Sequence, residues 1–412
     1  MKKPNWWKTA YAVCVLSAGA LLPLVIAQAA QAQTFSVIYT FMGGDDGASP
    51  NSALVADAAG NLYGTTEMGG SSKCFGNGCG TVFAVDSGGN ESVVHAFTGG
   101  GFGTDGWAPN GVTRDLAGNL YGTAWLGGQY GNGTIFEVTA TGQFLLLYML
   151  DQGGSGKGAY YPSAPVVLDP AGSLYGPAIY GGSGSCSLGC GVIFKLNPSG
   201  AFGIVHGFTG PDGGYPLGAL IRDAAGNLYG TTSWGGAHGA GTVFRLEAPG
   251  NETVLYSFTG GADGWGPTGV IRDSVGNLYG TTQEGGITSG PCAPFGCGVV
   301  FKVDLEGNET VLHSFHGLDG QSPVAGVIRD NAGNLYGATQ TGGEYGYGTV
   351  FKLSPAGQET VLYSFTGGAD GLEPGASLLL HNGDLYGTAF GGGKSGGCFG
   401  SGCGVVFKVT SR

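Results

Sequence analysis

The chain has 412 residues, with 16 basic and 28 acidic side chains and a formal charge of −12. This acidic balance, without a basic stripe, excludes nucleic acid as an expected partner. Its 88 glycines and 18 prolines are typical of a disordered chain, but apolar residues return at fixed places and predict a folded core.

Residues 1–32 predict a secretory signal peptide. Lys2, Lys3 and Lys8 give a positive start, residues 10–27 form an apolar run, and Ala30-Gln31-Ala32 fits a cleavage site. A retained membrane anchor is the alternative interpretation. Cleavage would leave 13 basic against 28 acidic residues, a charge of −15, and no later segment able to span a bilayer. We expect a secreted protein, extracellular or periplasmic.

One phrase, Asn61-Leu62-Tyr63-Gly64, returns in seven near-copies along the chain. Their tyrosines are 50 to 58 residues apart: Tyr63, Tyr121, Tyr175, Tyr229, Tyr279, Tyr336 and Tyr386. A repeat of this length indicates one supersecondary unit copied many times.

Each copy predicts four short strands. In one of them, the β-rich runs 269–273, 278–282, 299–303 and 309–315 are separated by turn residues. Such a meander is typical of a propeller blade. No segment after residue 32 shows sustained helical periodicity, so helix should be nearly absent. The expected core is the repeated Tyr of the second strand and one Phe per third strand: Phe83, Phe136, Phe194, Phe244, Phe301, Phe351 and Phe407.

The two ends of the repeat region complement each other. Residues 35–41 read as a fourth strand without its first three, and residues 405–409 read as a third strand without its fourth. An open stack would leave exposed edges. The sequence therefore predicts an all-β, seven-bladed β-propeller over residues 33–412, closed by the N-terminal strand joining the last blade.

The repeat resembles two known units. Gly269-Val270-Ile271-Arg272-Asp273, followed by Gly276-Asn277-Leu278-Tyr279, is similar to the NHL propeller repeat. The longer pattern over 230–245 resembles the GloVer tandem repeat of secreted bacterial "choice-of-anchor" proteins. That resemblance implies an exported bacterial repeat protein, often tethered by a C-terminal anchor, and supplies no catalytic residues. This chain departs from the anchored form, since it stops at Arg412 directly after a strand.

Eight cysteines after residue 32 fall into local pairs. In an exported protein these pairs read as disulfides that brace glycine-rich loops. Zinc is the alternative, but each loop offers only two ligands and no neighbouring histidine, so no metal is expected. The pairs are Cys74/Cys79, Cys186/Cys190, Cys292/Cys297 and Cys398/Cys403.

The outer-strand aromatic alternates between tyrosine and histidine in step with the cysteine pairs. This alternation indicates a duplicated two-blade unit, in which each histidine takes a tyrosine's place in packing. The positions are Tyr39, His95, Tyr148, His206, Tyr256, His313 and Tyr363.

Aromatic residues in the long loops of one face form the candidate ligand-binding set. Flat rings among polar groups suit sugar rings, and exposed apolar patches usually mark binding sites. The alternative is that the rings pack over glycines and stiffen their own loops. The candidates are Trp107, Trp125, Trp234, Trp265, Tyr130, Tyr160, Tyr161 and Tyr215; Tyr180, Tyr345 and Tyr347 lie in the same loops.

The same loops carry an Asp-Gly motif in six of the seven repeats. Six carboxylates around an axis could bind calcium, but Asp-Gly is also ordinary turn chemistry, which is the interpretation we favour. The aspartates are Asp46, Asp105, Asp212, Asp263, Asp319 and Asp370.

Three functions remain open. The first is an exported, non-catalytic module that binds glycan or surface protein, as a monomer and without a cofactor. The second is a polysaccharide-acting enzyme, a glycoside hydrolase or lyase, and the third is a structural envelope or matrix protein. Catalytic residues should break the repeat, and the residues that do so on the loop face include Glu67, His238, Glu284, His316, Glu344 and Glu373. Only their clustering would favour an enzyme.

Overall fold

The computed structural model describes residues 33–70, 74, 76–99, 105–151, 158–248, 250–394 and 398–410. In these residues regular structure is β-strand, apart from two short 3-10 turns, η1 (Gly290–Cys292) and η2 (Cys398–Gly400). The described part of the chain contains no helix long and apolar enough to cross a membrane. The expected scarcity of helix is confirmed. The signal peptide predicted for residues 1–32 lies outside the described residues.

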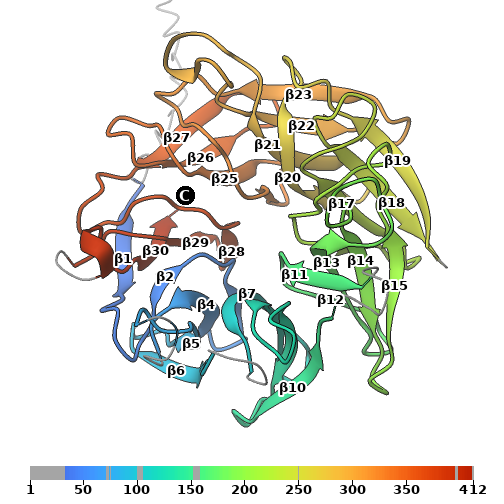
Figure 1. The fold of residues 1–412 in the computed structure, drawn as a ribbon. Coiled ribbons are helices and arrows are strands. Elements are labelled where there is room, and N and C mark those ends of the chain that lie inside the picture. Colours follow the sequence, from blue (N-terminus) through green and yellow to red (C-terminus); the bar gives the residue numbers. More distant parts are fainter. Residues whose placement is uncertain are drawn as a thin grey trace, which may run out of the picture. The chain divides into compact units, whose positions relative to one another are not determined.

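Seven antiparallel sheets stand around an axis (Figure 1). In each sheet the first strand lies nearest the axis and the fourth lies at the periphery. Blades one to four consist of β2 (Ala48–Pro50), β3 (Val55–Ala56), β4 (Leu62–Met68), β5 (Thr81–Val85) and β6 (Glu91–Ala96); β7 (Trp107–Arg114), β8 (Leu120–Leu126), β9 (Thr134–Val138) and β10 (Phe144–Met149); β11 (Ala159–Pro162), β12 (Val167–Leu168), β13 (Leu174–Gly181), β14 (Val192–Leu196) and β15 (Phe202–Gly207); and β16 (Ile221–Arg222), β17 (Leu228–Thr232), β18 (Thr242–Glu247) and β19 (Asn251–Ser257).

Blade seven is built from both ends of the described chain. Strand β1 pairs with β30 in antiparallel register, with Phe35 opposite Val409. The predicted closure of a seven-bladed ring by the N-terminal strand is therefore confirmed. Blades five to seven consist of β20 (Trp265–Arg272), β21 (Leu278–Glu284), β22 (Val299–Val303) and β23 (Glu309–Ser314); β24 (Ile328–Arg329), β25 (Leu335–Thr339), β26 (Thr349–Leu353) and β27 (Glu359–Ser364); and β28 (Leu379–His381), β29 (Asp384–Ala389), β30 (Val405–Thr410) and β1 (Phe35–Thr40).

The core lies between neighbouring blades. All seven third-strand phenylalanines are fully buried, as predicted. A second ring, which the prediction missed, follows the fourth strands: Phe41, Phe97, Leu150, Phe208, Phe258, Phe315 and Phe365 are also fully buried. Its six phenylalanines meet the next blade's phenylalanine edge to face, for example Phe97 and Phe136 at 5.2 Å between ring centroids. Such pairs add to the stabilisation from buried area.

The second-strand tyrosines are less buried than predicted, and in six blades the tyrosine hydroxyl donates to the aspartate of a turn. Tyr229 and Tyr336 are buried, but the other five are half-buried. In blade five the Tyr279 hydroxyl donates to Asp273 at 3.1 Å, and the same carboxylate accepts the Asn277 backbone N–H. This aspartate turn occurs in six blades. Blade seven instead uses an Asn382-Gly383 hairpin, with positive φ at both residues.

Candidate functional site

One backbone position is unusual in every blade. The residue before a proline that lies in the first strand or shortly ahead of it has a positive φ of 53° to 65°, although only one of the seven is glycine. A bulky side chain in this region is a genuine outlier and requires support from its surroundings. These left-handed residues are Ser49, Ala108, Tyr161, Tyr215, Gly266, Ser322 and Glu373.

A hydrogen bond between blades supports each left-handed residue. Its N–H donates to a carbonyl of the preceding blade, for example Tyr215 to Cys190 at 2.7 Å and Tyr161 to Asn132 at 2.8 Å. In blades one, three, five and seven that carbonyl belongs to the second cysteine of the local disulfide: Cys79, Cys190, Cys297 and Cys403. All four predicted disulfides are present. They brace the acceptor of a contact between blades as well as their own loops.

Two neighbouring left-handed residues are tyrosines, and their rings join an unbroken series. The ring centroids are separated by 6.4 Å for Trp125–Tyr161, 5.8 Å for Tyr161–Tyr180, 5.6 Å for Tyr180–Tyr215 and 5.8 Å for Tyr215–Trp234. We call these five residues the aromatic ribbon. It crosses blades two, three and four on the face that carries the long loops.

The ends of the ribbon face solvent. Trp125 and Trp234 are 42% and 41% exposed, and the three tyrosines between them are half-buried. Tyr160 is 5% exposed and lies behind the ribbon, in ring contact with Tyr161 and Tyr180. Its hydroxyl donates to the Leu188 carbonyl oxygen. The ribbon therefore has a hydrogen-bonded support beneath an accessible aromatic surface.

Models of the Gloeobacter/Verrucomicrobia repeat match residues 23–156, 71–292 and 287–412. The chain belongs to this repeat family. The resemblance drawn from the sequence is confirmed. No curated protein matches the chain in sequence.

Two solved structures are similar to this chain. The extracellular domain of a one-component system from B. thetaiotaomicron is similar with a TM-score of 0.54 and 12% identity, over 92% of this chain and 41% of that chain. A gluconolactonase from Xanthomonas campestris is similar with a TM-score of 0.43 and 16% identity, over 76% of this chain and 87% of that chain. At 12% identity, the similarity to the extracellular domain shows the fold alone. The four disulfides in this Gloeobacter/Verrucomicrobia repeat protein indicate an extracellular or periplasmic location.

The ribbon contains four of the eight predicted binding residues, Trp125, Trp234, Tyr161 and Tyr215, and a fifth, Tyr160, lies behind it. Trp265 is 39% exposed and Tyr130 is 51% exposed, but neither has a ring contact with the ribbon in the described structure. Trp107 packs instead against the core of blades one and two. Trp107, Trp125 and Trp265 lie at strand ends rather than in loops. Tyr180, left out of the predicted set, lies at the centre of the ribbon.

The Asp-Gly carboxylates do not converge on the axis. Each bonds to its own preceding fourth strand and loop, as when Asp263 accepts the Tyr256 hydroxyl at 3.0 Å and the Thr259 N–H at 2.7 Å. Each aspartate thus bonds within its own loop, as a turn residue does, but the backbone N–H groups that it accepts precede it, whereas the turn interpretation expected them to follow it. The arrangement provides no axial calcium ring among the described residues.

A second constellation lies at the outer seams between repeats. There the Tyr or His of one fourth strand faces a residue at the start of the next blade's fourth strand. Three seams hold stacked rings, Tyr363–Phe35, His95–Phe144 and Tyr148–Phe202, at 3.8 to 4.3 Å. The other four seams hold a glutamate: Glu91, Glu252, Glu309 and Glu359. Burial raises the pKa of each of these glutamates to about 7, with Asp46 adding to the effect at Glu91.

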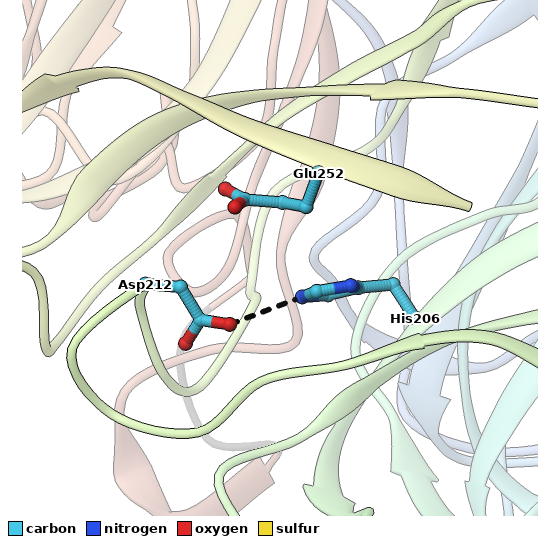
Figure 2. Close-up of side chains that lie close together, drawn as sticks. All are labelled: His206, Asp212 and Glu252. Carbon is cyan, nitrogen blue, oxygen red and sulfur yellow. Dashed lines mark ion pairs between the residues drawn. The ribbon is translucent and has the colours of Figure 1, made fainter.

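Two of the glutamate seams also contain histidine. His206 Nε2 lies 3.3 Å from Asp212 Oδ2, with Glu252 above them (Figure 2). His313 Nε2 lies 2.8 Å from Asp319 Oδ2, next to Glu359. In each group, one ligand atom per residue lies within 4.8 Å of the others.

The residues that break the repeat have separate surroundings. Glu67 accepts a hydrogen bond from Asn51 at 3.0 Å, and burial raises the pKa of its carboxyl. His316 pairs with Asp319 at 3.2 Å. Glu344 lines a pocket of about 630 Å³ at the margin of blade six, together with Tyr345 and Tyr363 but with none of the other five candidates. Glu67, His316 and Glu344 thus have different partners and make no contact with one another that the described structure records.

Proposed function

We propose that this protein is an exported, non-catalytic propeller that binds a glycan chain along its aromatic ribbon. The observation that carries the proposal is the series of five rings in contact across three blades. The equivalent left-handed positions of the other blades hold Ser, Ala, Gly or Glu. The aromatic rings are therefore a local departure from the repeat, which the scaffold itself does not require.

The shape and chemistry of the ribbon support a polymeric sugar. Flat apolar ring faces contact the C–H faces of sugar rings, and a site lined by aromatic residues with a few polar groups is typical of ligand binding. Tyr161, Tyr180 and Tyr215 each add a hydroxyl that can exchange hydrogen bonds with the sugar. Because the ribbon is elongated, several linked sugars would use it better than one.

We expect Trp125→Ala and Trp234→Ala to weaken retention of the purified protein on its best glycan from a panel of β-glucans, xylan, chitin and peptidoglycan. Each substitution removes an accessible stacking face, and stacking of this kind contributes about 1 kcal/mol, or about a fivefold change in affinity. Affinity electrophoresis and calorimetry would measure the change. Release of reducing ends, assayed in parallel, would detect hydrolysis.

Trp265→Ala is the matched control, because this tryptophan is 39% exposed but stands outside the ribbon. The Trp265→Ala variant should bind the glycan with the same affinity as the unaltered protein. Equal weakening by all three substitutions, or unchanged binding in the two ribbon variants with intact folds, would contradict the proposal.

A further inference from the structure

The histidine-containing seams carry an inference that is independent of the ribbon. We propose that His206, Asp212 and Glu252, and equivalently His313, Asp319 and Glu359, each bind one divalent transition-metal ion such as Zn²⁺. In both cases the His and Asp follow one blade and the Glu belongs to the next. A bound ion would therefore link two blades.

The geometry of the first cluster suits a metal. Bonds of about 2.1 Å to a tetrahedral zinc place ligand atoms about 3.4 Å apart, and His206 Nε2 lies 3.3 Å from Asp212 Oδ2. The His206 and Asp212 side chains are only 16% and 21% exposed. A hydrogen bond between the His206 ring and the Gly250 backbone orients that ring, as commonly occurs for histidine ligands.

Several of these buried ligand atoms have no hydrogen bond within the described protein. Glu252 Oε1 and Glu359 Oε1 have none, and His206 Nε2 has only its 3.3 Å ion-pair contact with Asp212. Buried polar atoms are normally satisfied, so each exception requires an explanation. A cation shared by the three side chains would satisfy them and would offset the repulsion between the two carboxylates.

The ligand types indicate which metals fit. An imidazole nitrogen with two carboxylates suits zinc and its first-row neighbours, whereas calcium and magnesium prefer oxygen alone. Three protein ligands leave a fourth position for water. In the second cluster, His316 Nε2 lies 3.2 Å from Asp319 Oδ2 but outside the group of three mutually close ligand atoms.

The remaining seams provide natural comparisons. Tyr256 replaces histidine beside Asp263 and Glu309, and its hydroxyl donates to Asp263 at 3.0 Å. At another seam His95 lies 2.9 Å from Asp105, but Phe144 stands where the glutamate would be. A three-ligand set arises only at seams that combine histidine with glutamate, and among the described residues this happens twice.

The test is the stoichiometry of Co²⁺ and Zn²⁺ binding to the purified full chain, measured by equilibrium dialysis and by the visible Co²⁺ spectrum. We expect two equivalents for the unaltered protein. His206→Ala and His313→Ala should each lose one, and the double variant should lose both. His95→Ala should lose none, because its seam lacks the glutamate.

A gain-of-function variant keeps the test informative if a histidine substitution impairs folding. Tyr256→His supplies the missing ligand beside Asp263 and Glu309, so a third equivalent is expected. Zn²⁺ should also raise the melting temperature of the unaltered protein by several degrees and have less effect on the double variant. Absence of Co²⁺ and Zn²⁺ binding, or two equivalents retained by the double variant, would overturn the proposal.

Discussion

At the scale of single residues, the seam glutamates place a carboxyl group in a buried position, where its ionised form is unfavourable. Glu91 Oε1 is buried without a hydrogen-bond partner among the described residues, and Tyr39 and Asp46 lie beside this carboxyl. Burial is the main reason that its pKa rises from 4.5 to about 7. The ionised form is therefore less stable in the folded protein than in the unfolded chain.

This shift predicts a stability that depends on pH. Between pH 4.5 and about 7 the folded protein holds the Glu91 proton and the unfolded chain releases it, so stability falls as pH rises through that window. Glu91→Gln removes the ionisable group and therefore this fall in stability with pH. We expect its melting temperature to exceed that of the unaltered protein at pH 8 and to equal it near pH 4.5.

Glu306→Gln, on an exposed turn, is the control and should change neither melting temperature. A Glu91→Gln effect of equal size at both pH values would show that ionisation is not its cause.

The sequence predicted best those residues that have the same structural role in several blades. The third-strand phenylalanines, the cysteine pairs and the aspartate turns could be read from spacing and residue type alone. The ribbon could be predicted only as scattered aromatic residues, because ring contacts depend on how neighbouring blades stack. The one local sequence feature that distinguishes the ribbon is a tyrosine before proline, in Tyr161-Pro162 and Tyr215-Pro216. In the other five repeats the residue before the equivalent proline is small or charged.

At the scale of elements, each disulfide loop is part of the contact between two blades. The Cys190 carbonyl accepts the Tyr215 N–H, and the Cys403 carbonyl accepts the Ser49 N–H at 2.8 Å. The two disulfides are therefore structurally equivalent, but only the first adjoins the aromatic ribbon. Comparing the two disulfides can therefore distinguish an effect on folding stability, which both should have, from an effect on glycan binding, which only the first should have.

Replacing both cysteines of either pair by serine should lower the free energy of unfolding by about 2 kcal/mol, since each disulfide closes a loop of only a few residues. Denaturant titration would measure this loss. Glycan affinity should fall only for the Cys186/Cys190 variant, because its Tyr215 backbone becomes less well held. A similar fall for the Cys398/Cys403 variant would refute this connection.

At the scale of the whole molecule, closure of the ring depends on β1. Phe35 stacks on Tyr363 of blade six at 3.8 Å and contacts Phe365 and Phe407. Phe202 makes the equivalent stack with Tyr148 at 4.3 Å, in the middle of the chain. One packing arrangement thus serves an ordinary seam and the seam that joins the two ends.

Phe35→Ala and Phe202→Ala should therefore cost similar amounts, about 3 kcal/mol each, as large-to-small substitutions of packed phenylalanine do. Chemical denaturation followed by tryptophan fluorescence would compare them. A large loss for Phe202→Ala with none for Phe35→Ala would show that β1 does not complete the ring in solution.

The pairing of β1 with β30 also governs when the molecule can finish folding. Thr34 and Thr410, which hydrogen-bond to each other at 2.8 Å, are 376 residues apart in sequence. Contacts this distant form late, because the loop-closure entropy must be overcome first. Strand β1 must therefore wait, with its edge unpaired, until β30 has formed, and this waiting edge is where a chaperone would be most useful.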